Sequence, residues 1–484
     1  MLLDFNPILD TDSYKPSHPA VYPKGMQGLY AYIEARVKKN EQQIVVVGQE
    51  LHIDKFFSTQ ITQAHIDEAI EMLTLHGEPF DPEPWQYLVD QYDGYWPVTI
   101  WGVPEGTVVP SGQVQVALEC ADPKLAWVAS WLETTWQRAV WYPSTIATRS
   151  REAMRLLKRM YTLTGAPLEA LPFALHDFGA RGATSYESAA VGGYGHLAAG
   201  FMGSDNLPAI RETRQRFKSA MPAFSVPATE HSVECSYGLD QAGEDAYLER
   251  VLDVYAKPGK IISIVLDGRD VIRASERLCT KYRDRIIASG ATIVFRPDSG
   301  NMMELVPRIL EMQAMAFGVT TSIGTDGREY RKPKHVGVLQ GDGINYKSMG
   351  ELLGIMVAQG FRADCVVFGS GGDLLQNVTR DTFKYAQKAS AILMPVWIED
   401  GDIGSRWDYS WKGYNKDPIT DPGKASKMGR VMLFKSRVTG EFASIDIDRD
   451  QISNEWEPMF KLLYRNGTRY SHSTLEEIRE RTRV

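Results

Sequence analysis

The sequence has few cysteines and no long hydrophobic run. Its 484 residues include only four cysteines, which lie far apart and form no CxxC pair. This spacing argues against a disulfide framework or a zinc ribbon and is typical of a reducing compartment. The longest clear apolar run covers residues 261–266, whereas a membrane helix needs roughly 18 apolar residues. Because the N-terminus also lacks a basic segment followed by an apolar stretch, we expect a cytoplasmic protein without a membrane segment.

The sequence also lacks an excess of positive charge and the motifs of several common enzyme classes. Its 53 Lys and Arg residues are outnumbered by 61 Asp and Glu residues, so the net charge is −8 and a nucleic-acid partner is disfavoured. No repeat, low-complexity tract or Gly/Ser linker is present. HExxH, GxSxG, the Walker lysine motif and the Rossmann GxGxxG are absent, so the reaction classes that use them lose their usual signatures.

The first part of the chain combines β-rich and helical segments. Aromatic residues with partial alternation over residues 29–36 predict a half-buried strand, and residues 49–88 are expected to be mostly helical. Three short β-rich runs within residues 96–119, separated by turn signals, predict a small antiparallel sheet.

Two helices are expected next, over residues 124–141 and 144–161, with Pro143 as a break between them. Three tryptophans of the first helix are expected in the core rather than around a ligand: Trp127, Trp131 and Trp136.

From about residue 170, short β-branched runs end abruptly in polar, glycine-containing turns, and helical stretches follow. The runs are FALHDFGARG, IISIVLDGRD, TIVFRPDSG, VGVLQGDG and CVVFGSGG. Continuous apolar strands that alternate with helices predict a parallel sheet covered on both faces. Polar groups at the carboxyl ends of the strands favour a (β/α) barrel, with an open doubly wound sheet as the alternative.

The fold prediction is therefore an α/β protein with two domains. An irregular (β/α) barrel-like catalytic domain is expected over residues 166–378. Residues 1–165 and 379–484 are expected to form a discontinuous, β-rich α+β domain, to which the basic, turn-rich tail returns. Thr474 and Glu477 have the spacing of a capping box and predict a last helix.

The best candidate for a phosphate site is the glycine-rich turn Gly369-Ser370-Gly371-Gly372. A predicted strand precedes it and a helix follows it, and glycines allow backbone N–H groups to approach an anion closely. The alternative is a tight turn between a strand and a helix without a ligand.

Two more strand ends carry candidate binding residues. Arg296 and Asp298 are two residues apart and so point to the same side of an extended chain, where they either bind a phosphorylated substrate or form a structural salt bridge. Gly341-Asp342-Gly343 either places a carboxylate against sugar hydroxyls or is a plain turn.

His231 is the candidate reactive side chain. Glu230 is its neighbour in the sequence, and Asp267 ends a later predicted strand. A histidine oriented by a carboxylate can act as a base, an acid or a phosphoryl acceptor, although a single histidine is more often structural. We interpret His176 as a scaffold residue.

Several segments in one order link the chain to a known family. The carrying segments are DTDSYK (10–15), LHDFGARG (175–182), GSD (203–205), SVPATEHS (225–232), RPDSG (296–300), QGDG (340–343), FGSGGDLLQ (368–376) and DPGKASKMGR (421–430). The chain resembles, nearly from end to end, the nicotinamide phosphoribosyltransferases of the type II phosphoribosyltransferase group.

The resemblance implies a reaction and its partners. Nicotinamide and phosphoribosyl pyrophosphate would give nicotinamide mononucleotide and pyrophosphate, with Mg²⁺ bound to the substrate and no metal site of the protein's own. ATP would be a coupled substrate that transiently phosphorylates His231. The protein would be a homodimer whose active sites are shared between the subunits.

The resemblance also implies roles for individual residues. The catalytic residues would be His231, Asp298 and Asp267. The residues that bind the base and the phosphoribosyl group would be Tyr14 of the partner subunit, Phe178, Arg181, Asp205, Ser225, Arg296, Gly341 and Asp342. Those that bind phosphates would be Arg36 of the partner subunit, Ser370, Gly371, Gly372, Arg380, Lys388 and Lys424.

Two segments depart from the family pattern. Where the family commonly has Ser-Asp-Ser-Tyr-Asp, this chain has Leu266-Asp267-Gly268-Arg269-Asp270, which keeps both acids but changes their neighbours. Asp373 stands where a third glycine often follows the phosphate loop, and its charge would weaken phosphate binding if it faced the site.

Three other functions compete with this interpretation. A nicotinate phosphoribosyltransferase would want a cation where Asp205 offers an acceptor, so Asp205 favours the amide. A non-catalytic scaffold protein would not need its basic, acidic and aromatic site residues intact. An aldolase-like sugar-phosphate enzyme would need a Schiff-base lysine near a strand end, and none of the strand turns above carries one.

Overall fold

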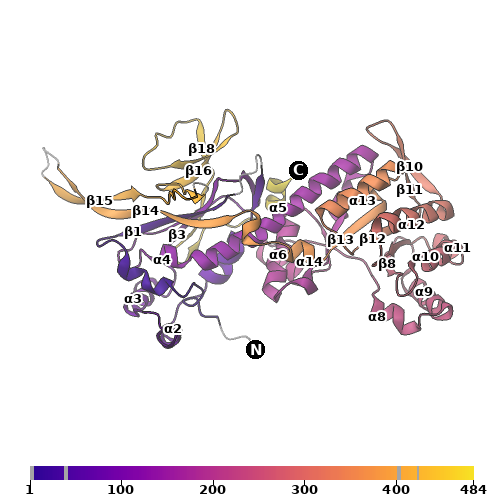
Figure 1. Ribbon diagram of the computed structural model, residues 1–484, viewed down its shortest axis with the longest axis horizontal. Helices are drawn as coiled ribbons and strands as arrows, with labels where there is room; N and C mark the ends of the chain where they lie inside the picture. The colour runs from indigo at the N-terminus through magenta and orange to yellow at the C-terminus, as the bar shows by residue number, and fades with distance from the viewer. Residues whose placement is uncertain (1–4, 37–41, 400–404, 422–423) are drawn as a thin grey trace. The chain divides into compact units, whose positions relative to one another are not determined.

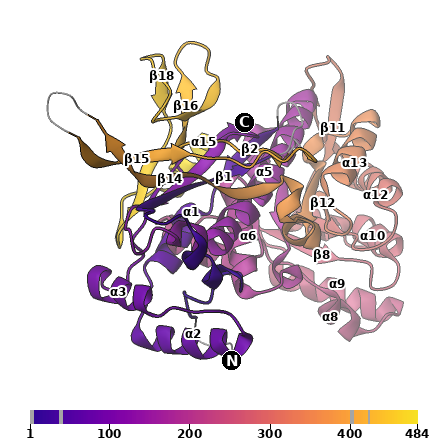
Figure 2. The ribbon, with the colours of Figure 1, turned by 60° about the vertical axis from the view of Figure 1, so that its left-hand side comes forward.

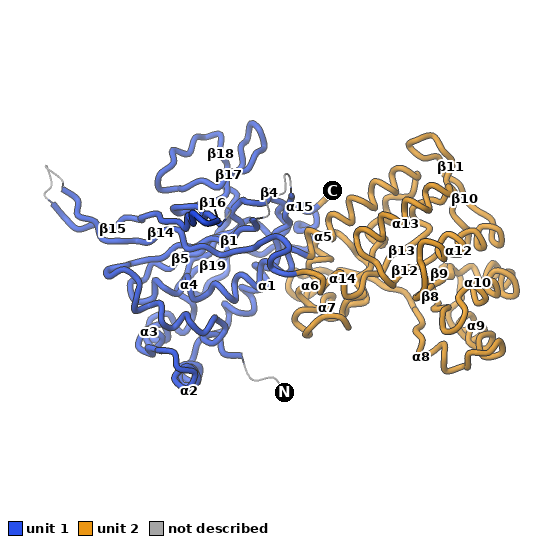
Figure 3. The backbone as a smooth tube through the Cα atoms, viewed as in Figure 1, with its two compact units in different colours: residues 1–145, 379–482 blue, residues 146–378, 483–484 orange. Residues whose placement is uncertain are grey.

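The computed structural model describes residues 5–36, 42–399, 405–421 and 424–484. The chain divides into two compact units, the first made of residues 1–145 and 379–482 and the second of residues 146–378 and 483–484 (Figure 3). The first division falls inside the long helix α5 (Glu133–Thr164), whereas the sequence-based boundary at residues 165/166 falls after it. The sequence-based domain boundaries stay a prediction.

Unit 1 is built on an antiparallel sheet whose order is β15-β14-β1-β5-β3-β19-β20. Its strands are β1 (Gly28–Ala35), β3 (Thr99–Gly102), β5 (Val114–Cys120), β14 (Tyr385–Ile398), β15 (Arg406–Gly413), β19 (Lys461–Arg465) and β20 (Thr468–Arg469). Strands β1 and β14 lie side by side although they are far apart in the sequence (Figure 1). Because both the N-terminal and the C-terminal parts of the chain supply strands, this sheet is complete only when the C-terminal strands pair with the N-terminal ones.

Two smaller sheets complete the β-structure of unit 1. Strand β2 (Gln43–Val46) pairs with β4 (Thr107–Pro110), and β16 (Val431–Ser436) lies between β17 (Phe442–Asp446) and β18 (Trp456–Pro458). The three expected strands within residues 96–119 therefore all form. They do not make one sheet, because β3 and β5 pair with each other while β4 pairs with β2.

The helices of unit 1 bury a core rich in tryptophan. They are α1 (Gln49–His52), the π-helical turn Ile53–Phe57, α2 (Gln63–His76), α3 (Glu83–Tyr92), α4 (Val128–Trp131) and α15 (Leu475–Thr482). Trp127, Trp131 and Trp136 are all buried, as predicted. The capping box also forms, since the Glu477 N–H donates to Thr474 Oγ1 and the Thr474 N–H donates to a Glu477 carboxylate oxygen.

The predicted break at Pro143 is wrong, because α5 continues through this residue. A proline inside a helix removes one backbone hydrogen bond and crowds the preceding turn. Here the Ser144 hydroxyl bonds both the N–H and the carbonyl of Val47, each at 3.0 Å. The backbone of Gly48 packs directly on the Ala139 carbonyl and the proline ring. These tertiary contacts hold the helix together at the position where local propensity would end it.

Unit 2 contains a sheet of six parallel strands in the order β7-β6-β13-β12-β9-β8. Its strands are β6 (Leu175–Asp177), β7 (Gly203–Ser204), β8 (Ile261–Val265), β9 (Thr292–Arg296), β12 (Val336–Gln340) and β13 (Val366–Ser370). The other elements are α6 (Tyr186–Ala198), α7 (Leu207–Arg216), α8 (His231–Glu234), α9 (Gln241–Tyr255), α10 (Val271–Cys279), α11 (Arg283–Ser289), α12 (Met302–Phe317), α13 (Tyr346–Ala358), α14 (Gly372–Gln376) and the hairpin β10 (Val319–Ile323)–β11 (Glu329–Pro333). Figure 2 labels α6, α8, α9, α10, α12 and α13 among them. The parallel α/β prediction is confirmed.

An irregular segment joins the two edges of this sheet. Phe224 pairs with Gly203 of the edge strand β7, and Ala228 pairs with Ser263 of the other edge strand, β8. The curled sheet is thus closed by isolated bridges rather than by a regular strand, which agrees with the expected irregular barrel. Pro227 lies inside this segment and cannot donate to a ladder, so only single bridges form.

Within the described residues, no helix combines the length and the apolar character that crossing a membrane requires.

Candidate active site

The ring of Phe178 lies across the carboxyl ends of two neighbouring strands. A Cβ atom added to Gly369 of β13 would stand 2.1 Å from this ring, and one added to Gly341 after β12 would stand 3.6 Å from it. The Phe178 N–H donates to the Ser370 carbonyl at 2.9 Å, which fixes the turn after β6. The two glycines therefore leave the space in which the aromatic ring lies over the strand ends.

The buried carboxylate of Asp177 joins the Phe178 turn to the Asp205 turn. It accepts hydrogen bonds from the Gly179 N–H and from Asn206 Nδ2, both at 2.8 Å. The Asp205 N–H donates to the Asp177 carbonyl at 3.0 Å. Burial raises the pKa of Asp177 to about 6. The sequence placed Asp177 at a strand end without a role, and it gave no signal for Asn206, whose partner Asp177 is 29 residues away.

Asp205 and Ser225, both expected to bind substrate, lie together. The Ser225 hydroxyl donates to Asp205 Oδ1 at 2.5 Å, and both side chains are exposed. Arg181, on the turn after Phe178, is also exposed. Ser225 belongs to the segment that closes the barrel, so the closing segment brings a binding residue to the strand ends.

Arg296 and Asp298 form a two-point ion pair. Arg296 Nε lies 3.1 Å from Asp298 Oδ1 and Nη2 lies 2.7 Å from Oδ2, so the salt bridge that the sequence left open as an alternative is present. A Cβ atom on Gly341 would stand 3.4 Å from Asp298 Oδ1. Asp298, Gly341 and Phe178 therefore face a common space at the strand ends.

The glycine-rich turn after β13 has open space beside two of its glycines. A Cβ atom added to Gly371 or Gly372 would meet nothing within 4 Å. Ser370 differs from its neighbours, because its side chain is buried and its hydroxyl donates to the Ile344 carbonyl at 3.0 Å. The backbone of this turn, rather than the Ser370 hydroxyl, is what the structure offers to an anion.

Asp373 is engaged within its own helix. It accepts a hydrogen bond from Asn377 Nδ2 at 2.7 Å, and both residues line a cavity of about 400 Å³ whose wall also includes Arg149 and Lys347. The Asp373 side chain is thus hydrogen-bonded along its own helix and lines this cavity.

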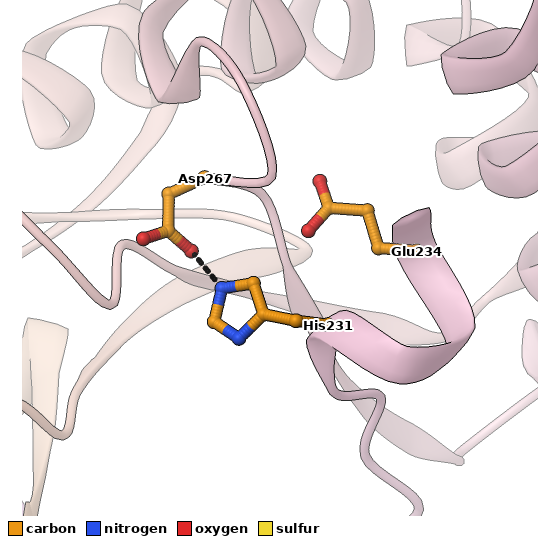
Figure 4. Close-up of side chains that lie close together, drawn as sticks. All are labelled: His231, Glu234 and Asp267. Atoms are coloured by element: carbon orange, nitrogen blue, oxygen red, sulfur yellow. Dashed lines mark hydrogen bonds and ion pairs between the residues drawn. The ribbon is translucent and has the colours of Figure 1, made fainter. Parts of the chain in front are cut away.

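His231 is paired with Asp267, as Figure 4 shows. Its Nε2 lies 2.9 Å from Asp267 Oδ1, and its side chain is 45% exposed while that of Asp267 is 6% exposed. In the described part of the chain, Nδ1 has no hydrogen bond. The buried carboxylate thus fixes one ring nitrogen and leaves the other accessible.

A second carboxylate near His231 comes from Glu234, not from Glu230. Glu230 accepts a hydrogen bond from the Ser232 hydroxyl, whereas Glu234 is buried and accepts from the Gly268 N–H at 3.0 Å. Burial and the nearby charge of Asp267 raise the pKa of Glu234 to about 7, against the opposing effect of the Gly268 hydrogen bond. Its position three residues after His231, on the same helical turn, was the sequence signal for this residue.

His231, Glu234 and Asp267 also form the one group, among the residues that the structure describes, with three possible metal-ligand atoms close together. These atoms lie within 4.8 Å of one another. One carboxylate oxygen of Asp267 is engaged by His231 and one of Glu234 by the Gly268 N–H.

Asp342 is exposed in the turn after β12, and its backbone carbonyl accepts from Gln340 Nε2 at 2.9 Å. The other predicted residues belong to unit 1. Tyr14 is 53% exposed, and its hydroxyl lies 3.3 Å from Asp12. Burial lowers the pKa of Lys388, with Arg36 and Lys416 among the charges around it. Arg380 and Lys424 form ion pairs with Asp381 and Asp421. Residues 422–423 of the DPGKASKMGR segment lie outside the described residues.

Comparisons with known proteins give related names along most of the chain. The profile of the nicotinate phosphoribosyltransferase (NAPRTase) family matches residues 173–454, and that of the nicotinamide phosphoribosyltransferase N-terminal domain matches residues 6–100. A relative from Xanthomonas campestris, named nicotinamide phosphoribosyltransferase, is 40% identical over 98% of this chain and 97% of its own. A second relative of the same name, from Acinetobacter baylyi, is 29% identical over 99% of this chain and 98% of its own length.

Two solved structures share the fold. Nicotinate-nucleotide pyrophosphorylase from Pyrococcus furiosus has a TM-score of 0.57 at 14% identity and covers 100% of this chain and 96% of its own. Human nicotinic acid phosphoribosyltransferase has a TM-score of 0.56 at 15% identity and covers 98% and 92%.

Proposed function

The chain belongs to the nicotinate phosphoribosyltransferase (NAPRTase) family and is a phosphoribosyltransferase, a kind of pentosyltransferase; from this premise we propose that its base is nicotinamide. Its reaction would join nicotinamide to phosphoribosyl pyrophosphate and release nicotinamide mononucleotide and pyrophosphate, as a step of NAD salvage. Relatives named for this reaction along nearly the full chain support the choice of base. Nicotinate phosphoribosyl transfer is the alternative.

Asp205 is the observation that carries the preference for the amide. Its carboxylate stands at the strand ends, where the Asp177 carbonyl holds its backbone and Ser225 holds one oxygen. A carboxylate accepts a hydrogen bond from a carboxamide N–H₂, whereas it repels the negative charge of nicotinate. The Phe178 ring nearby supplies a flat apolar face for a pyridine ring.

The proposed phosphoribosyl site uses the strand ends beside Phe178. Departure of pyrophosphate leaves positive character on the ribose and negative charge on the leaving group, so the site needs carboxylates near the sugar and donors near the phosphates. Asp298 and Asp342 are the carboxylates, and Arg296 with the backbone of Gly371 and Gly372 supplies donors. Binding of substrate would open the Arg296–Asp298 pair and free both side chains for it.

The proposed dimer brings further groups. Tyr14 of the partner subunit would stack on the second face of the base, and Arg36 of the partner subunit would contact phosphates. Arg380, Lys388 and Lys424 would add positive charge. Magnesium is proposed to arrive with the phosphates of the substrate, since Mg²⁺ commonly binds through substrate phosphates and waters.

His231 is proposed to accept a phosphoryl group from ATP. Its Nδ1 lone pair would attack the γ-phosphorus, the bond to the β-phosphate oxygen would break, and ADP would leave. The proton on Nε2 stays shared with Asp267, whose negative charge stabilises the phosphorylated, positively charged ring. Label from γ-phosphate should appear in the parent protein and not in His231→Ala.

Product analysis tests the proposed reaction. Nicotinamide and nicotinate are supplied in parallel, each with and without ATP, and the mononucleotides are quantified by mass spectrometry. Asp205→Asn should lower the preference for nicotinamide over nicotinate by roughly 10-fold, because it removes a charge repulsion. Asp253→Asn, an exposed carboxylate on α9, is the matched control.

Two results would contradict this proposal. Nicotinate mononucleotide as the main product of the parent protein would overturn the choice of base. An unchanged ratio in Asp205→Asn would remove the role given to Asp205 while leaving the reaction itself intact.

A further inference from the structure

The segment that carries His231 is tied to the end of β8 at two places. The first tie precedes the histidine: Thr229 Oγ1 accepts from the Val265 N–H at 3.0 Å, and the Tyr247 hydroxyl bonds both Thr229 and the Val265 carbonyl. These contacts are buried. They hold the chain on one side of the His231–Asp267 pair.

The second tie follows the histidine and depends on Glu234. Its carboxylate accepts the Gly268 N–H at 3.0 Å, and Gly268 is the residue directly after Asp267. Glu234 is 7% exposed, so solvent competes little for this hydrogen bond. The His231–Asp267 hydrogen bond lies between the two ties.

The Glu234 carboxylate fills the space beside the Gly268 Cα, where a side chain at position 268 would lie. A Cβ atom on Gly268 would stand 2.6 Å from Glu234 Cδ and within 3.0 Å of both carboxylate oxygens. Gly268 is not among the glycines with a positive φ, so its backbone conformation is open to other residues. A side chain at position 268 would therefore displace the Glu234 carboxylate rather than strain the backbone.

We propose that Glu234 is a positioning residue for the phosphoacceptor, because its hydrogen bond to Gly268 holds Asp267 in place against His231 Nε2. Without this bond, the peptide between Asp267 and Gly268 is free to turn, and the half-exposed imidazole loses its fixed orientation. Nδ1 would then present its lone pair to an incoming phosphoryl group for only part of the time. This inference rests on the proposed role of His231.

The test uses five variants of the full-length protein. Glu234→Ala removes the acceptor, and Gly268→Ala displaces it. Glu234→Gln keeps an oxygen that can accept the Gly268 N–H. Gly354→Ala is the control, because an added Cβ at this exposed helix position meets nothing within 4 Å. The double variant Glu234→Ala/Gly268→Ala completes a cycle.

Two rates are measured for each variant. The first is ³²P labelling of the protein from γ-labelled ATP, with His231→Ala as background. The second is carbethoxylation of His231 by diethyl pyrocarbonate, followed by peptide mass spectrometry, which reports the nucleophilicity of the ring without ATP. Synthesis without ATP and the thermal midpoint are recorded alongside.

Glu234→Ala and Gly268→Ala should each lower both rates by on the order of 10-fold, as expected for loss of a buried hydrogen bond. The double variant should be no slower than the slower single variant. Glu234→Gln should keep most of the parent's labelling and carbethoxylation rates. Gly354→Ala should match the parent. If Glu234→Ala does not fold, Gly268→Ala and Glu234→Gln still make the comparison.

Other outcomes overturn the inference. Parent-like rates in Gly268→Ala would do so, as would multiplied losses in the double variant. A fall of ATP-independent synthesis and of the thermal midpoint in step with both rates would assign Glu234 a structural role only. A parent protein that takes no label would refute the proposed phosphohistidine, and the carbethoxylation rates would still decide the role of Glu234.

Discussion

Burial of the Asp177 carboxylate makes stability depend on pH. Its pKa is about 6 in the folded protein against an ordinary value of 3.8, so the folded state binds this proton more tightly than the unfolded chain. The contribution of Asp177 is therefore most favourable below pH ~4 and declines as the pH rises to about 6, by on the order of 3 kcal/mol. Asp177→Asn should flatten this decline.

Thermal midpoints of the parent and of Asp177→Asn, measured from pH 4 to 7, check this expectation. Asp67→Asn, at an exposed position of α2, is the control for loss of a carboxylate. The same slope in Asp177→Asn and the parent would mean that Asp177 titrates at its ordinary pH.

Residues that act through near neighbours in the sequence could be predicted, and those that act across the fold could not. The spacing of Arg296 and Asp298 predicted that they share one side, and they form an ion pair. Asn206 gave no such signal, because its partner Asp177 is 29 residues away. Glu230 was named because it adjoins His231 in the sequence, but it precedes the helix in an extended conformation and accepts from Ser232, whereas Glu234 lies on the same helical turn as His231.

The carboxyl ends of β12 and β13 make Gly369 a sharp test of the base site. A methyl group at this position would stand 2.1 Å from the Phe178 ring and displace it. Gly369→Ala should raise the KM for nicotinamide by about 10-fold or more, because a misplaced stacking ring no longer holds the base. Gly337→Ala, in the same β12–β13 pair, is the control, since its nearest contact would be an ordinary 3.7 Å.

Steady-state kinetics with nicotinamide varied at saturating phosphoribosyl pyrophosphate measure this effect. Equal KM values for Gly369→Ala and Gly337→Ala would exclude Phe178 as the stacking ring.

Elements with a clear hydrophobic pattern were predictable, whereas elements set by distant contacts were not. The apolar runs before residues 267, 296 and 370 form β8, β9 and β13 as expected. The break at Pro143 was wrong because Val47 and Gly48, far away in the sequence, support the helix there. The closing segment around Phe224 and Ala228 has no strand pattern, and only its two bridges identify it.

At the scale of the whole chain, the local pattern of apolar and turn residues indicated the structural class of each part but not which strands pair with which. The change at about residue 170 correctly marked the start of the parallel strands. By contrast, Ala31 pairs with Ala389, and no feature of either segment identifies the other as its partner. Such pairings follow from the global arrangement of buried surfaces, which a single sequence does not display.

The proposed sharing of active sites makes a prediction about the assembled protein. Tyr14 lies in unit 1 and is 53% exposed, while Phe178 lies in unit 2, and the proposal has them on opposite faces of one base from two subunits. Tyr14→Ala and Phe178→Ala should each be nearly inactive alone. In a mixed dimer, one site carries both changes and the other carries neither. Random mixing of equal amounts should therefore restore about a quarter of the parent activity, because half of the dimers are mixed and half of their sites are intact.

Differently tagged chains, refolded or co-expressed and purified through both tags, give the mixed dimers for this assay. Phe178→Ala mixed with itself under both tags controls for the procedure. Purified mixed dimers that stay inactive would mean that the two rings do not serve one site, and about half of the parent activity, from one intact site in two, would mean that they do.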